Sequence, residues 1–208
     1  MRDILALYAD CDDWPTLGDH NARLSHLDLA NADGVPLRFE STSRRRTRRK
    51  APAVVDVQAT YDGHVAYKGI VPTREQSVHD FFNVVSWAAF PKTKQRINAL
   101  QVSALTRRIG ANAARVPNAR SREEDLLTML DEGGLIRTSR SFILGHAIFE
   151  HLYTQRSDVR AFAVQLDAQS NERTDADSMV AEKLKDGIFA LDPEGQKGVS
   201  VSATTLRC

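Results

Sequence analysis

The sequence predicts a mainly helical α+β fold, in which a small N-terminal β-hairpin or sheet packs on four or five helices. Apolar residues recur at helical spacing through most of residues 77–153, whereas segments with strand-like alternation are short and confined to the first 70 residues. The chain has 208 residues, of which 42% are hydrophobic and 26% charged. These values are typical of a soluble globular protein and exclude wholesale disorder.

The strand predictions are few. Residues 1–40 look irregular except for residues 36–40, where apolar and polar residues alternate. Residues 53–60 are rich in β-branched residues, and residues 64–70 can return antiparallel after a turn at residues 61–63. This pattern predicts a β-hairpin.

The helical signal begins after residue 73. Phe81, Val84, Val85 and Ala88 form one apolar stripe, which predicts a helix over 77–90. Either Thr73 or Ser77 can cap this helix, and Pro91 ends or kinks it. Ser121 and Glu124 have the spacing of a second capping box. Further helices are expected at about 93–109, with Gly110 as the stop, and at 121–131, 142–153, 158–168 and 177–186.

The expected domain organisation has two parts. Residues 1–153 form a core domain that carries a basic insert at 41–50, and residues 154–208 form a more polar C-terminal extension. We expect poor order over residues 192–208, where Gly, Pro and small residues accumulate.

The overall charge is balanced, but one local run is strongly basic. There are 28 Lys and Arg against 27 Asp and Glu, a net charge of +1, which excludes a uniformly basic nucleic-acid-binding surface. A loop that carries so many like charges can bind an anionic partner or nucleic acid, or can simply be solvated. No aromatic residue interrupts the run, so base stacking is not indicated. The candidate anion-binding residues are Arg44, Arg45, Arg46, Arg48, Arg49 and Lys50.

Cysteine usage and hydropathy predict a cytoplasmic protein without a membrane partner. Cys11 and Cys208 form no C-x-x-C pair, and we expect both thiols to be reduced. No window approaches the ~20 apolar residues of a transmembrane helix.

The chemistry-bearing residues are concentrated on two predicted helices. His79, Asn83 and Ser86 form a polar line on the face opposite the apolar stripe. His146 and Glu150 lie four residues apart on the second helix, and this spacing lets them share a metal or orient one another.

One hypothesis is a single site built from both helices. The candidate metal ligands are His79, His146 and Glu150, and the candidate catalytic residues are His79, Asp80, Asn83, His146 and Glu150, with Asp131 and Glu132 as further carboxylates. A divalent metal held by such a set activates water for hydrolysis. The structural alternative is that the histidines are satisfied core residues and that Arg74 pairs with Asp80. A weaker signal is that Thr93 and Lys94, at a helix start, can bind an anion.

The motifs around these residues resemble a bacterial family known as domain of unknown function 3025. The matching residues are Val71, Pro72, Thr73, Arg74, His79, Asp80, Phe81, Phe82, Asn83, Trp87, Phe90, Pro91, Thr93, Lys94, Asn98, Leu100 and Gln101. Residues 36–39, 122–134 and 145–152 are similar to further family elements, so the resemblance covers roughly residues 14–153. Residues 155–208 inherit nothing from it.

The resemblance implies a bacterial protein and supplies no activity, because none is assigned to the family. From the residues themselves we expect a polar pocket that binds a small molecule, and the leading hypothesis for its activity is a metal-dependent hydrolase. The alternative from another class is a non-catalytic binding protein that recruits an anionic partner through residues 44–50.

Overall fold

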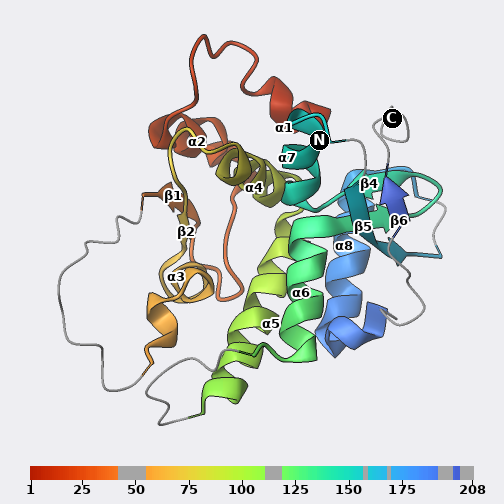
Figure 1. Cartoon of the computed structure of the whole chain (residues 1–208). Helices are drawn as coiled ribbons and strands as arrows, with labels where there is room; N and C mark the ends of the chain where they lie inside the picture. Colours follow the sequence, from red (N-terminus) through yellow and green to blue (C-terminus); the bar gives the residue numbers. More distant parts are fainter. Residues whose placement is uncertain (42–54, 111–118, 157–158, 168–169, 192–198, 202–208) are drawn as a thin grey trace.

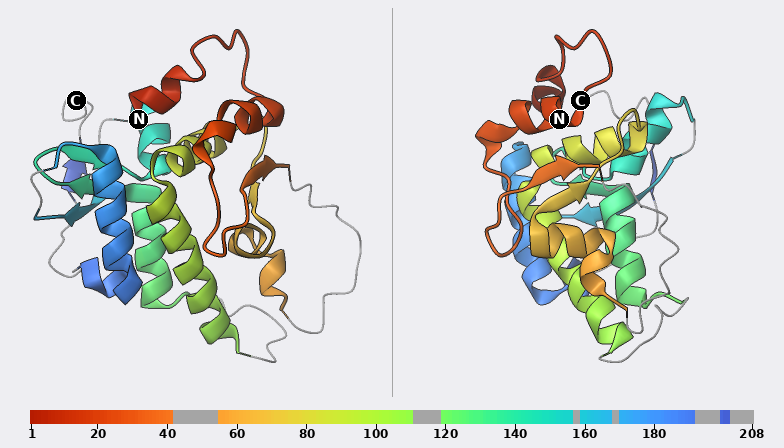
Figure 2. Two further views of the ribbon diagram at one scale, coloured as in Figure 1. Left: turned by 180° about the vertical axis from the view of Figure 1, so that it is seen from behind. Right: turned by 90° about the vertical axis from the view of Figure 1, so that its left-hand side faces the viewer.

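The computed structural model describes residues 1–41, 55–110, 119–156, 159–167, 170–191 and 199–201 (Figure 1). The fold is mainly helical α+β, as the sequence predicts. Helix α5, Pro91–Ile109, lies between α6, Arg122–Gly133, and α8, Arg173–Lys183, and contacts both. Two small sheets lie on either side of this group of helices (Figures 1 and 2).

The N-terminal segment is more regular than expected. Helix α1 spans Arg2–Ala6, and helix α2 spans Leu17–Arg23. Thr16 and Asp19 form a complete capping box at the start of α2, since each side chain binds the backbone N–H of the other residue. The sequence pattern does not predict this helix, because the apolar segment that flanks the capping box is short.

The first sheet is parallel and is not a hairpin. Strand β1, Arg38–Glu40, confirms the predicted strand and pairs with β2, Ile70–Pro72. The predicted hairpin over residues 53–70 is wrong where the structure describes it, because Tyr61–Lys68 forms helix α3. Thr60 caps this helix by accepting from the Gly63 N–H, and Gly69 ends it with a φ of 63°. These terminal signals outweigh the β-branched composition.

The helices that carry His79 and Lys94 begin and end close to the predicted positions. Helix α4 spans Val78–Ala89 and is capped by Ser77, one of the two expected caps. Helix α5 spans Pro91–Ile109, so the proline ends one helix and occupies the first position of the next. Gly110 stops α5, as predicted.

Helix α6, Arg122–Gly133, runs directly into the second sheet. The predicted capping box of Ser121 and Glu124 is present. Strand β3, Gly134–Arg137, follows without a loop, and β4, Ser141–Ile143, pairs antiparallel with it. The predicted helix over 142–153 therefore begins late, since α7 spans His146–Tyr153.

The predicted helix over 158–168 is wrong, because Val159–Gln165 forms strand β5. This strand is parallel to β3, and β6, Val199–Val201, extends the sheet to the order β4-β3-β5-β6. Four consecutive residues of β5 are buried, so the strand lacks the alternation by which a half-exposed strand is recognised.

Helix α8, Arg173–Lys183, starts earlier than predicted and packs against α5 (Figure 1). Its Ala176 and Val180 join the main apolar core with Val84, Trp87 and residues of α6. Short 3-10 turns occupy Ser25–Leu27, Val57–Ala59, Leu184–Asp186 and Ile188–Leu191. Burial of apolar area from both halves of the chain in one core stabilises the fold.

Two predictions concern residues that the structure does not describe. These residues are the basic run 44–50 and most of 192–208, so the binding role of the first and the poor order of the second stay predictions. Within the described ranges, no helix is long and apolar enough to cross a membrane.

Candidate functional site

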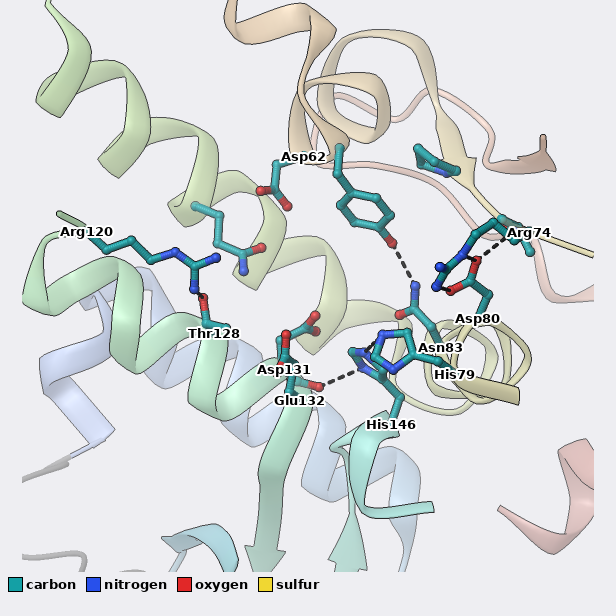
Figure 3. Close-up of a pocket in the computed structure, with 14 residues that line it drawn as sticks. Asp62, Arg74, His79, Asp80, Asn83, Arg120, Thr128, Asp131, Glu132 and His146 are labelled. Carbon is teal, nitrogen blue, oxygen red and sulfur yellow. Dashed lines mark hydrogen bonds and ion pairs between the residues drawn. The ribbon is translucent and has the colours of Figure 1, made fainter. Parts of the chain in front are cut away.

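A polar cavity of about 490 Å³ lies where helices α3, α4, α5, α6 and α7 meet (Figure 3). Its lining includes four of the predicted catalytic residues, which are His79, Asp80, Asn83 and His146. It also includes Asp131 and Glu132, the carboxylates expected at the end of α6. The structure thus brings together histidines that lie 67 positions apart in the chain.

The two histidines face one another across the junction of α4 and α7. His79 lies in the first turn of α4, and His146 is the first residue of α7. Their Nε2 atoms are 3.2 Å apart, and the rings meet edge to face (Figure 3). This contact is the geometric convergence that the sequence hypothesis requires.

The close approach depends on Gly145. A Cβ atom at this position would lie 2.4 Å from the Glu132 carbonyl oxygen and 2.5 Å from the Gly134 nitrogen. Only glycine lets the start of α7 pack against the end of α6. Ser86 of α4 reinforces the junction by donating to the Leu144 carbonyl oxygen at 2.7 Å. Ser86 therefore has a structural role.

The remaining nitrogens of the two rings are occupied by acceptors. His146 Nδ1 lies 3.0 Å from the Asp131 carbonyl oxygen, which can only accept, so this nitrogen carries the proton. His79 Nδ1 lies 2.8 Å from the Glu150 carboxylate, which accepts in the same way. Both Nε2 atoms consequently present lone pairs to each other, and these lone pairs repel unless a proton or a metal ion lies between them.

Burial keeps His146 neutral. Its side chain is only 4% exposed. Burial and the nearby Lys94 charge lower the pKa of His146 to about 4, so the ring is uncharged at neutral pH. A neutral imidazole is the form that binds a metal ion.

Glu150 does not occupy the position expected of a metal ligand. It contacts the Nδ1 side of His79, on the opposite side of the ring from the facing Nε2 atoms, and it is not a lining residue of the cavity. Across the described ranges, no group of three or more His, Cys, Asp or Glu side chains is arranged to hold a metal. The predicted set is therefore assembled as two imidazoles with a supporting carboxylate.

Asp80 is held by an arginine, as the structural alternative expected. Two nitrogens of the Arg74 side chain bind the two Asp80 oxygens at 2.9 and 2.8 Å, and the Arg74 backbone N–H adds a third bond. Burial by itself raises the pKa of Asp80, but these hydrogen bonds and the Arg74 charge outweigh it and hold the pKa below its ordinary value. Asp80 therefore stays ionised and shapes one wall.

A buried ion pair forms the base of the cavity. The Lys94 Nζ donates to Asp131 Oδ1 at 2.5 Å and to Asn83 Oδ1 at 2.9 Å, and it lies 5.2 Å from the centre of the Trp87 ring. Burial raises the pKa of Asp131, but the charge of Lys94 outweighs it, so the pKa is lowered. Asp131 is ionised and able to accept a proton.

The α5 start is no free anion site. The Lys92 and Thr93 backbone N–H groups donate to the Asp177 carboxylate at 3.1 and 2.8 Å. Asp177 thus already occupies the amides that a bound anion would need. The prediction that Thr93 and Lys94 bind an anion there is wrong.

Several residues of the cavity are not predicted by the sequence pattern. Tyr61 and Asp62 lie in the first turn of α3, where the sequence pattern predicts a hairpin turn. Thr60 at the start of this helix and Gly69 at its end are the local signals that could have predicted a helix there. Burial and the Asp131 charge raise the pKa of Asp62 to about 6. Three further lining residues that the sequence pattern does not predict are Gln101, Arg120 and Thr128.

This is a mainly helical α+β protein whose polar cavity contains a pair of facing histidines. Residues 50–141 match the sequence model of a family described as protein of unknown function (DUF3025), and this segment belongs to that family. The match includes His79, Asn83, Lys94 and Asp131, whereas His146 and Glu150 follow it. No curated protein and no solved structure matches the chain.

Proposed function

We propose that this protein is a metal-dependent hydrolase whose metal ion is bound by the Nε2 atoms of His79 and His146. The observation that carries the proposal is the 3.2 Å separation of these two atoms. Two imidazole ligands of a tetrahedral zinc ion, each at about 2.0–2.1 Å from the metal, are about 3.3 Å apart. The observed separation fits this geometry.

The surroundings of the two rings support the same assignment. Histidines that bind metals in proteins donate their other N–H to a carboxylate or a backbone carbonyl, which fixes the ring and the tautomer. His79 does so to Glu150, and His146 does so to the Asp131 carbonyl oxygen. Glu150 is thereby a positioning residue in the proposed site.

The cavity provides space for water and substrate beside the imidazole pair. A divalent metal would supply a Lewis acid and an activated water there. The Asp131 carboxylate lines the same cavity and is held ionised by Lys94, so it can accept the proton that the attacking water releases. Asp62 has a raised pKa and stands on the opposite wall (Figure 3), where it can donate a proton to the leaving group.

The test begins with elemental analysis of tag-free protein purified without chelator. We expect near-stoichiometric transition metal in the wild type and its loss in His79→Ala and in His146→Ala. His26→Ala is the matched control, since His26 is exposed and does not line this cavity. Circular dichroism checks folding, and His79→Gln replaces His79→Ala if the smaller side chain unfolds the protein.

Hydrolysis is then tested with the metal-loaded wild type on carboxylate and phosphate esters, with His146→Ala as the comparison. A folded wild type that holds no metal after incubation with zinc would contradict the proposal. Metal that remains in both histidine variants would contradict it equally, because the ion would then be bound elsewhere.

A further inference from the structure

A chain of hydrogen bonds fixes the orientation of the Asn83 amide. The Lys94 amine donates to one Asn83 atom at 2.9 Å, and an ammonium group has no acceptor, so this atom is the amide oxygen. The other end of the amide is therefore the NH₂ group. It donates to the Tyr61 hydroxyl oxygen, 2.7 Å away.

The orientation of Asn83 decides what Tyr61 does with its own proton. Because the Asn83 NH₂ group donates to the Tyr61 oxygen, Tyr61 cannot donate in return. No acceptor for the Tyr61 proton is present among the residues that the structure describes. The ring lines the cavity, and 40% of the Tyr61 surface is exposed. The hydroxyl proton is consequently available to a ligand.

We infer that the Tyr61 hydroxyl is a substrate-binding donor, which hydrogen-bonds an anionic oxygen of a phosphate ester in this cavity. Lys94 and Asn83 are positioning residues, because their hydrogen bonds orient the Tyr61 hydroxyl proton toward the cavity. The inference deepens the proposed function and rests on it for the reaction, but the binding of an oxyanion by Tyr61 can be measured without any turnover.

The charge of Arg120 favours an anionic oxygen as the acceptor. Arg120 lines the far end of the cavity, where its guanidinium contacts the Thr128 hydroxyl at 3.3 Å (Figure 3). Arg120 forms no salt bridge in the described part of the chain, although its charge acts on the nearby Asp62, so the guanidinium can pair with a substrate phosphate.

The experiment is a titration of the purified protein with inorganic phosphate, followed by two-dimensional NMR, with the metal content of every sample measured alongside. Tyr61→Phe removes only the hydroxyl. Asn83→Asp keeps the shape but replaces the donor with an acceptor, which draws the Tyr61 proton out of the cavity. Tyr67→Phe is the matched control, because Tyr67 is exposed on the same helix and does not line the cavity.

We expect Tyr61→Phe and Asn83→Asp each to weaken phosphate binding roughly ten-fold, the effect of one hydrogen bond to a charged group. Tyr67→Phe should bind as the wild type does. Because Asn83→Asp also adds a negative charge that repels phosphate, the orienting role of Asn83 is measured with the double variant. Removing the Tyr61 hydroxyl should cost about ten-fold in the wild type but nothing further in the Asn83→Asp background, whereas a merely structural amide would leave the two losses independent.

Wild-type affinity in Tyr61→Phe, or the absence of phosphate binding by the folded wild type, would overturn the inference. Tyr61-dependent phosphate binding in a protein that holds no metal would refute the proposed metal-dependent activity and leave this inference standing. A metal-loaded protein whose phosphate affinity does not depend on Tyr61 would refute this inference and leave the metal site standing.

Discussion

Replacement of Lys94 by methionine tests the buried ion pair on which the cavity depends. The Lys94 side chain is 3% exposed and that of Asp131 is 16% exposed. Methionine preserves most of the volume but leaves the Asp131 carboxylate and the Asn83 oxygen without their donor. Removing one partner of a buried pair typically costs about 3–5 kcal/mol, because the other charge remains buried and unpaired. We expect a loss of that size in the free energy of unfolding at neutral pH.

The loss should depend on pH in a defined direction. In the wild type the pKa of Asp131 is lowered, so the ionised carboxylate stabilises the fold above about pH 4, and this contribution disappears as the pH falls through the folded pKa. Without Lys94, burial raises that pKa instead, so acid protonates Asp131 and relieves the buried charge. The difference between Lys94→Met and the wild type should therefore shrink as the pH falls from 7 toward 4.

The assay is urea denaturation followed by tryptophan fluorescence, since Trp87 lies beside Lys94. Lys92→Met is the control, because the Lys92 side chain is exposed and its amine binds the Ser178 hydroxyl at the surface. It should change the free energy of unfolding by less than about 0.5 kcal/mol. A loss below about 1 kcal/mol for Lys94→Met, or one that is the same at every pH, would refute the argument.

Three further predictions follow from the geometry. Gly145→Ala should destabilise the protein by several kcal/mol, because its Cβ would overlap backbone atoms of the α6–β3 junction; an unchanged thermal midpoint would show that the junction can open at no cost. Burial lowers the pKa of His20 to about 4, so protonation of the unfolded chain should favour unfolding as the pH falls from 6.5 to 4. His20→Gln should therefore reduce the dependence of the free energy of unfolding on pH in this range, measured by urea denaturation, and an unchanged dependence would contradict the prediction. Glu150→Ala should weaken zinc binding by about 10–100-fold in competition with a chromophoric chelator, and wild-type affinity would show that Glu150 does not support His79.

The helices at the centre of the fold were predictable because their signals are local. Ser77, Pro91 and Gly110 mark helix ends through interactions within one or two turns, and the structure places the ends of α4 and α5 accordingly. The apolar stripe that contains Val84 and Val85 enters the core as its spacing predicts.

The second sheet could not be predicted in the same way. Strand β5 is buried at Ala161, Phe162, Ala163 and Val164, so it lacks the alternation of a half-exposed strand. In its pairing with β3, Phe162 lies opposite Gly134, which is 28 residues earlier in the chain. No local sequence pattern encodes a pairing over that distance.

Residue type and helical spacing alone identify the side chains that can do chemistry: His79 and Asn83 on one helix face, and His146 with Glu150 on another. The packing of α4 against α7 brings the two Nε2 atoms together and places Glu150 at the other nitrogen of the His79 ring. Helical periodicity fixes which face a residue occupies, because it depends on a rotation of about 100° per residue. It carries no information on which nitrogen of a ring meets which neighbour, since that depends on contacts between elements far apart in the chain.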